Sequence, residues 1–391
     1  MQPLPLLAAL ALLWLVGIAL RLAILAVPPV IPLLRDEFRL TGTDIGILSG
    51  LPVILFAVAA LAGSRLVARI GVVAAVVAGL LLTALGSALR AGASHVLLLF
   101  AATVVMGVGV AVTQPAMPAL VGRWLPQRIV LGTGVYTNGL LVGEILPVGL
   151  FPVLYPMLGE SWRATFVLWA LPIVAIAGLI LMLAPRNGGD AIAVSARWFP
   201  DWRARDIWRL GLIFGGVGPF YFGSNAFLPG YLKEVGRPDL ISPALTALNL
   251  GQLPASLLLI GFARHIESRA WPFVLASVLG LVGVGGVVVT TGVLTVASAA
   301  LLGFAAGAAF ALGLTLPPLL SRSDEVARVS AAMFTISYAM TVVVAIVCGA
   351  IWDFTGTARL TFLPIALAAL PSIVLAPTIR FGRKTGRGRA P

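Results

Sequence analysis

Long apolar segments separated by short polar connectors run along almost the whole chain. A helix needs roughly 20 mostly apolar residues to cross about 30 Å of hydrocarbon. With turn residues and charges as boundaries, the sequence predicts twelve such spans. They lie near residues 6–33, 44–63, 72–90, 95–121, 130–155, 164–184, 208–231, 242–262, 272–290, 294–319, 329–351 and 360–379. The pattern therefore predicts an all-α polytopic membrane protein with twelve transmembrane helices.

Composition agrees with this pattern. Of the 391 residues, 60% are hydrophobic and 10% are charged, whereas soluble proteins carry about 25% charged residues. The N-terminal apolar run lacks a basic leader and is too long for a signal peptide, so we expect it to remain as the first span. The net charge of +12 follows the predicted topology, and we expect no nucleic-acid partner.

The positive charges predict the orientation in the membrane. An even number of spans puts both termini on one side, and the loops on that side hold 18 of the 26 Lys and Arg residues. The opposite loops hold 7, with Arg90 among them, and Arg21 lies inside a span. The positive-inside rule then makes both termini cytoplasmic, in the inner membrane.

The longest polar connector divides the spans six and six. It predicts an N-terminal half at residues 1–184, a cytoplasmic loop at 185–207, and a C-terminal half with a basic tail at 208–391. Two such halves are typical of transporters built from internal repeats, whose substrate site lies at the interface between the repeats.

An offset of 200 residues supports a duplication. Gly107 then corresponds to Gly307, and Arg21 corresponds to Tyr221. The first span of each half thus carries a polar or aromatic side chain at equivalent depth, and we expect one central site between the halves.

Two stretches resemble a known family. LRLAILAVPPVIPLL (20–34) and QPAMPALVGRWLPQRIVLGTGVYTNGLLVG (114–143) are similar to segments of the cyanate and 2-nitroimidazole transporter family within the major facilitator superfamily. The resemblance implies two pseudo-symmetric six-helix halves that work by alternating access. Glu144 stands where the family resemblance implies a small residue, so the family's substrate does not transfer directly.

Arg21 is the leading candidate for a functional residue. It lies about 15 residues into the first span, roughly 20 Å deep. An ionised group there is costly and is by default a functional hypothesis. Its planar fork of donors suits a carboxylate, nitro or cyanate-like group. The alternative is a structural arginine satisfied by carbonyls or by a fixed ion pair.

Glu144 is about 14 residues into the fifth span, also near the midplane. The resemblance makes the first and fifth spans neighbours, so Arg21 and Glu144 are expected to come close enough to pair. Glu144 is then either a proton-coupling site that responds to substrate at Arg21, or half of a permanent pair that holds two helices together.

Uncharged polar side chains recur in both halves. Hydrocarbon offers them no partner, so as a set they are expected to line a wet cavity and bind substrate. They are Gln114, Tyr136, Asn138, Tyr221, Asn225, Asn249, Gln252 and Tyr338.

Other classes of protein are less consistent with the sequence. Its two histidines and single cysteine do not form a metal-ligand pattern, and no cofactor motif or catalytic cluster is present, so an enzyme is not expected. The connecting loop is too small for a sensor's output domain. A multidrug or metabolite exporter of the same fold, with an apolar cavity, stays the alternative.

We expect a monomer in the lipid bilayer that binds a small molecule, with protons as a candidate coupling ion.

Overall fold

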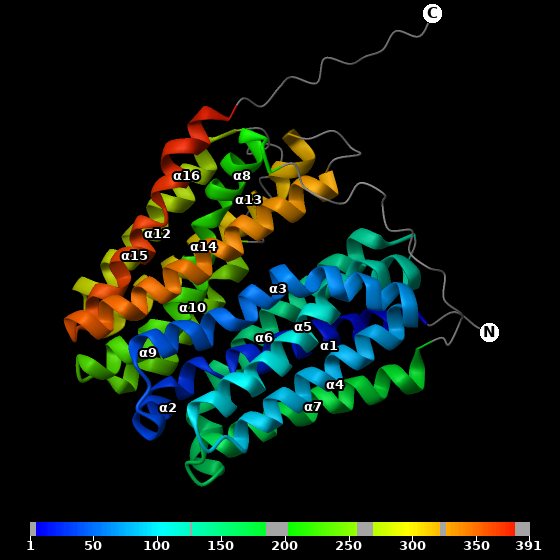
Figure 1. Cartoon of the computed structure of the whole chain (residues 1–391), viewed down its shortest axis with the longest axis horizontal. Helices are drawn as coiled ribbons and strands as arrows, with labels where there is room; N and C mark the ends of the chain where they lie inside the picture. The colour runs from blue at the N-terminus through cyan, green and yellow to red at the C-terminus, as the bar shows by residue number, and fades with distance from the viewer. Residues whose placement is uncertain (1–4, 126, 185–201, 256–268, 321–325, 380–391) are drawn as a thin grey trace, which may run out of the picture.

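The computed structural model describes residues 5–125, 127–184, 202–255, 269–320 and 326–379, and the regular structure in these ranges is helical (Figure 1). The N-terminal half contains α1 (Leu6–Leu25), η1 (Pro28–Val30), α2 (Ile31–Phe38), α3 (Gly42–Ile70), α4 (Val72–Ala91), α5 (Val96–Trp124), α6 (Ile129–Met157) and α7 (Trp162–Leu183).

The C-terminal half has the same order of long helices with more breaks. It contains α8 (Arg205–Gly215), η2 (Pro219–Gly223), α9 (Ser224–Glu234), η3 (Pro238–Leu240), α10 (Ile241–Leu250), α12 (Trp271–Val289), α13 (Val293–Leu320), α14 (Val326–Thr355), η4 (Ala358–Thr361), α15 (Phe362–Leu367), α16 (Leu370–Leu375) and η5 (Ala376–Thr378). η2 is a π-helical turn that joins α8 to α9.

Nine helical segments within the described ranges are long and apolar enough to cross a membrane. The other three expected spans are helical too, and correspond to α3, to the α8–η2–α9 segment and to α10. The expected continuation of α10 runs into residues 256–268, which lie outside the described part, as does most of the 185–207 loop. The predicted break near residues 290–292 is confirmed, since α12 ends at Val289 and α13 begins at Val293.

Glycines bring α1 and α6 together backbone to backbone. A Cβ atom on Gly139 would clash with the carbonyl of Trp14, and one on Gly143 would clash with the carbonyl of Ile18. Small residues of this kind let membrane helices approach closely. This contact sets the distance between the turns that follow, where Arg21 and Glu144 lie.

The 200-residue offset corresponds to equivalent packing in the two halves. A Cβ atom on Gly107 of α5 would lie 2.5 Å from Leu55 Cδ1 of α3, and one on Gly307 of α13 would lie 2.9 Å from Gln252 Cα after α10. In each half, the fourth span therefore packs on the second span through the matched glycine.

Arg90 is the last residue of the predicted third span, and its charge was counted with the loop that follows. α4 continues to Ala91, so Arg90 occupies the last helical turn, and its side chain is fully buried. The guanidinium bends into the helix bundle because it finds acceptors there, on Ala23 and Thr103.

The two halves meet along α3 and α14, which converge at one end and spread apart toward the other (Figure 1). At the end where α3 begins, Gly42 approaches the carbonyl of Gly349, and a Cβ atom on Gly42 would lie 2.6 Å from it. Ser242 of α10 donates a hydrogen bond of 2.5 Å to the carbonyl of Val148 on α6. The interface between the halves is thus tightest where α3 and α10 begin.

Candidate functional site

Arg21 and Glu144 form an ion pair between α1 and α6. Arg21 Nε lies 3.2 Å from Glu144 Oε1, and the two side chains are 12% and 6% exposed. The predicted proximity of these residues is confirmed by their geometry, and it follows from the close glycine packing of the two helices. Burying two charges costs several kcal/mol per ion unless they are paired, so each charge requires the other.

The ion pair leaves donors of the Arg21 guanidinium without hydrogen-bond acceptors. Nε and Nη1 of Arg21 are buried and have no hydrogen-bond partner within the described part of the chain. Nε is near Glu144, but the two are not aligned as a hydrogen bond. A buried donor without an acceptor costs about 1–3 kcal/mol, and more when charged. Arg21 therefore has unused capacity to bind an acceptor-rich group.

Glu144 also reaches the other half of the protein. Its Oε2 accepts a hydrogen bond of 2.9 Å from Nε2 of Gln252, which lies in the helical turn after α10. The pair of charges on the N-terminal half is therefore joined to the C-terminal half through one amide. Any relative movement of α6 and α10 changes the surroundings of Glu144.

Three tyrosines interact electrostatically with the Arg21 guanidinium: Tyr136, Tyr221 and Tyr338. They come from α6, η2 and α14, and so from both halves. This brings together three of the predicted site residues around the arginine.

The amides of the C-terminal half form a closed network. Tyr221 donates to Asn249 Oδ1 at 3.0 Å, and Asn249 Nδ2 donates to Asn225 Oδ1 at 3.2 Å. Asn225 Nδ2 in turn donates to the Tyr221 carbonyl at 2.9 Å. Asn225 and Asn249 are 3% and 0% exposed. Through these hydrogen bonds, Asn225 and Asn249 hold Tyr221 in place.

Two predicted residues lie apart from this network. Asn138 is exposed and accepts a hydrogen bond of 2.9 Å from Trp14 Nε1. Gln114 of α5 has a buried Oε1 without a hydrogen-bond partner among the described residues. Gln114 therefore offers an unused acceptor, while Asn138 is engaged with α1.

The sequence pattern did not indicate the aromatic side chains near the site. Trp14 precedes Arg21 by seven residues and therefore lies on the same face of α1. Phe334 precedes Tyr338 by four residues, and their ring centroids are 5.7 Å apart. Phe56 approaches Tyr338 from α3 at 6.0 Å. Helical spacing from the predicted residues was the signal that would have identified Trp14 and Phe334.

Two consecutive charged residues of α2 connect the two halves. The Arg35 guanidinium lies 3.8 Å from the centre of the Trp352 ring, and Asp36 pairs with Lys233. Together with a contact between Thr43 and Asp353 at the start of α3, these pairs define what we term the closed end.

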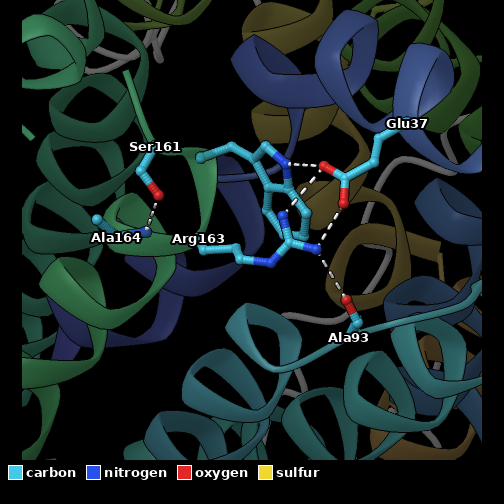
Figure 2. A network of polar contacts seen from close by, with 6 residues as sticks. Glu37, Ala93, Ser161, Arg163 and Ala164 are labelled. Atoms are coloured by element: carbon cyan, nitrogen blue, oxygen red, sulfur yellow. Dashed lines mark hydrogen bonds and ion pairs between the residues drawn. The ribbon is translucent and has the colours of Figure 1, made fainter. Parts of the chain in front are cut away.

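The next residue of α2, Glu37, binds within its own half. Its carboxylate pairs with Arg163 at 2.5 Å and accepts from Trp162 Nε1 at 2.6 Å. Figure 2 shows the Arg163 guanidinium between Glu37 and the carbonyl of Ala93, to which it donates at 3.2 Å. This network fixes α2 to α7 and leaves Arg35 and Asp36 to bind the other half.

Comparisons with known proteins agree with this architecture. The family model of the Major Facilitator Superfamily matches residues 13–345. The cyanate transport protein CynX of Escherichia coli (strain K12) is 31% identical over 303 residues, which cover 77% of this chain and 78% of that protein. The 2-nitroimidazole transporter of the same organism is 26% identical over 365 residues, covering 91% of each.

Solved structures share the fold. A bacterial homolog of the human lysosomal transporter Spinster, inward-facing and unoccupied, aligns with a TM-score of 0.71 at 15% identity over 95% of each chain. The nucleoside transporter NupG aligns with a TM-score of 0.72 at 13% identity, over 94% of this chain and 97% of that one. The family match over most of the chain, supported by the resemblance in sequence and by the shared fold, shows that this protein belongs to the major facilitator superfamily of membrane transporters.

Proposed function

We propose that this protein is a secondary transporter that moves a small anionic or strongly polar molecule across the inner membrane, with Arg21 as its anchor. The observation that carries the proposal is the buried Arg21 guanidinium, whose Nε and Nη1 have no hydrogen-bond partner in the described part of the chain. A planar, permanently charged donor group of this kind suits a carboxylate, nitro or cyanate-like ligand. The protein acts as a monomer, without catalysis.

The places where the halves make contact support alternating access as the mechanism. The closed end joins them through Arg35, Asp36 and Thr43. The distribution of positive charge assigns both termini to the cytoplasm, and the closed end to the opposite side of the membrane. The arrangement is therefore inward-facing, and transport requires these contacts to break as the cytoplasmic ends of the halves come together.

The proposal includes proton coupling through Glu144. Glu144 is held by the charge of Arg21 at one oxygen and by Gln252 at the other. An anionic substrate at Arg21 competes with Glu144 for the same positive charge, which favours protonation of the carboxylate. Substrate and proton would then bind together and move in the same direction.

Cyanate and 2-nitroimidazole, which the names of two relatives mention, are the first substrates to test. A thermal-shift screen of both molecules and of small carboxylates identifies a ligand, because binding to the folded state raises the apparent stability. Uptake of that ligand is then measured in proteoliposomes.

Two variants of Arg21 test the anchor. Arg21→Ala is expected to abolish uptake and Arg21→Lys to lower it at least tenfold, because hydrogen bonds to charged groups contribute about 1.5–3 kcal/mol. Arg237→Lys is the matched control, since Arg237 pairs with Asp239 at the surface. Uptake at the parent level in both Arg21 variants would refute the proposal.

The aromatic contacts around Tyr338 favour one second candidate, an exporter of apolar molecules. Phe56 and Phe334 pack against Tyr338 from different helices and place apolar rings beside it. Such an exporter would tolerate Arg21→Ala and would lose activity in Phe334→Ala. Uptake measured in Arg21→Ala and in Phe334→Ala therefore distinguishes the two functions.

A further inference from the structure

Arg90 places a second cation among the helices of the N-terminal half. Its side chain is fully buried in the last turn of α4. Nη1 donates to the carbonyl of Ala23 at 2.8 Å, and Nε donates to Thr103 Oγ1 at 3.0 Å. The guanidinium carbon lies 5.6 Å from the centre of the Phe166 ring. The side chain thus contacts α1, α5 and α7.

None of the ion pairs within the described ranges includes Arg90. Its positive charge faces the end of α1 instead, because Ala23 is in the last turn of that helix. The final carbonyls of a helix lack intrahelical donors and carry the negative end of the helix dipole. A buried arginine is therefore favourable here, where a buried lone cation otherwise is costly.

The break in α1 is what makes the Ala23 carbonyl available. In an unbroken helix this oxygen would accept from the amide of Val27, but Val27 donates to Ile24 instead, at 3.4 Å. Pro28 and Pro29 follow and have no N–H to donate. The α-helical hydrogen-bonding pattern stops after Leu25, a 3-10 turn follows at Pro28–Val30, and α-helix resumes at Ile31. Arg90 takes the place of the missing amide at this break.

Arg21 lies just before the break. It is two residues ahead of Ala23, so the angle at which α1 ends affects where the Arg21 guanidinium points relative to Glu144. We propose that Arg90 is a positioning residue: by binding the free Ala23 carbonyl it fixes the angle of the broken first span and holds Arg21 in its pose beside Glu144. The consequence for transport rests on the proposed role of Arg21, whereas the effect on the break does not.

The test measures the geometry of the break without substrate. Spin labels are attached at Leu7, which is 80% exposed on α1, and at Arg39, which is exposed just after α2. Pulsed dipolar EPR then gives the distribution of distances between the two labels, which are roughly 48 Å apart along the helical path. The buried Cys348 is replaced by Ala beforehand so that only the two introduced cysteines react.

The variants separate positioning from general stability. Arg90→Met removes both donors, and Arg90→Lys keeps one donor for Ala23. Ser87→Ala is the matched control on the same helix, because fully buried Ser87 donates to the carbonyl of Phe166 on α7 at 3.1 Å and leaves α1 untouched.

We expect the distance distribution to be at least twice as broad in Arg90→Met, intermediate in Arg90→Lys and unchanged in Ser87→Ala. Parent-like distributions in both Arg90 variants would overturn the proposal, as would equal broadening in Ser87→Ala. If Arg90→Met does not fold, Arg90→Lys and Thr103→Val decide, because both keep a buried cation. Broadening in these two supports the proposal, and parent-like distributions refute it, whatever the uptake assay shows.

Discussion

The carboxylate of Asp353, near the end of α14, accepts two hydrogen bonds from Thr43 at the beginning of α3: 2.9 Å from the backbone amide and 2.6 Å from Oγ1. Its other oxygen accepts from the amide of Gly42 at 2.5 Å. The first amides of a helix have no intrahelical acceptor and carry the positive end of the helix dipole. A side chain of one half therefore caps a helix of the other, and this cap must open when the halves separate at the closed end.

Removing this cap should favour separation at the closed end. Losing an N-terminal cap costs about 0.5–2 kcal/mol, so we expect Asp353→Ala to raise the population open at this end roughly two- to thirtyfold. Pulsed dipolar EPR between labels at Arg39 and at Phe354, which is 91% exposed, measures that population. Glu37→Gln is the control because Glu37 binds within its own half. An equal shift in the control would contradict the role assigned to Asp353.

The ion pair between Asp36 and Lys233 should contribute less. Both side chains are largely exposed, at 64% and 44%, and exposed pairs contribute about 0.2–1 kcal/mol. We expect Asp36→Asn to raise the open population less than about sixfold at low salt, with the effect fading at high salt. The charge-exchanged double variant, Asp36→Lys with Lys233→Asp, should restore the parent distribution. A salt-independent effect would show that the pair does not act through its charges.

Close packing of α1 on α6 should be intolerant of a single methyl group. Gly139→Ala places a Cβ atom against the Trp14 carbonyl, and overpacking of this kind costs about 1–3 kcal/mol. We expect a lower midpoint of thermal unfolding in detergent together with weaker uptake. Gly134→Ala on the same helix is the control, because nothing lies within 4 Å of its Cβ position. Equal destabilisation by both variants would show that an added methyl group destabilises α6 wherever it is placed, and that the contact with Trp14 is not the cause.

Neutralising Glu144 should separate coupling from substrate binding. The amide oxygen of Glu144→Gln still accepts from Gln252, but the side chain no longer takes up a proton. We expect accumulation driven by a pH gradient to vanish, while counterflow of substrate persists. Asp239→Asn, at the surface, serves as the control. Persistent gradient-driven accumulation in Glu144→Gln would rule out a proton-coupling role.

Hydropathy and helical spacing were sufficient to predict much of this protein. The length of the apolar segments predicted an all-α membrane fold, because only helices and closed barrels satisfy backbone groups in hydrocarbon. The depth of Arg21 and Glu144 in their spans followed from the rise per residue, and the predicted pair lies at 3.2 Å. The spacing between Gly107 and Gly307 indicated a repeat, and both glycines pack in matching places.

Contacts between segments that are distant in the sequence could be identified only from the tertiary structure. Sequence spacing does not indicate that Gln252 reaches Glu144, or that Asp353 caps α3 at Thr43, since each pair joins helices of different halves. The charge of Arg90 was counted with a loop because a charge at a span end resembles a boundary, whereas its environment is set by three other helices. Local pattern determines which segments enter the membrane, but the partner of each buried polar group depends on how the helices pack.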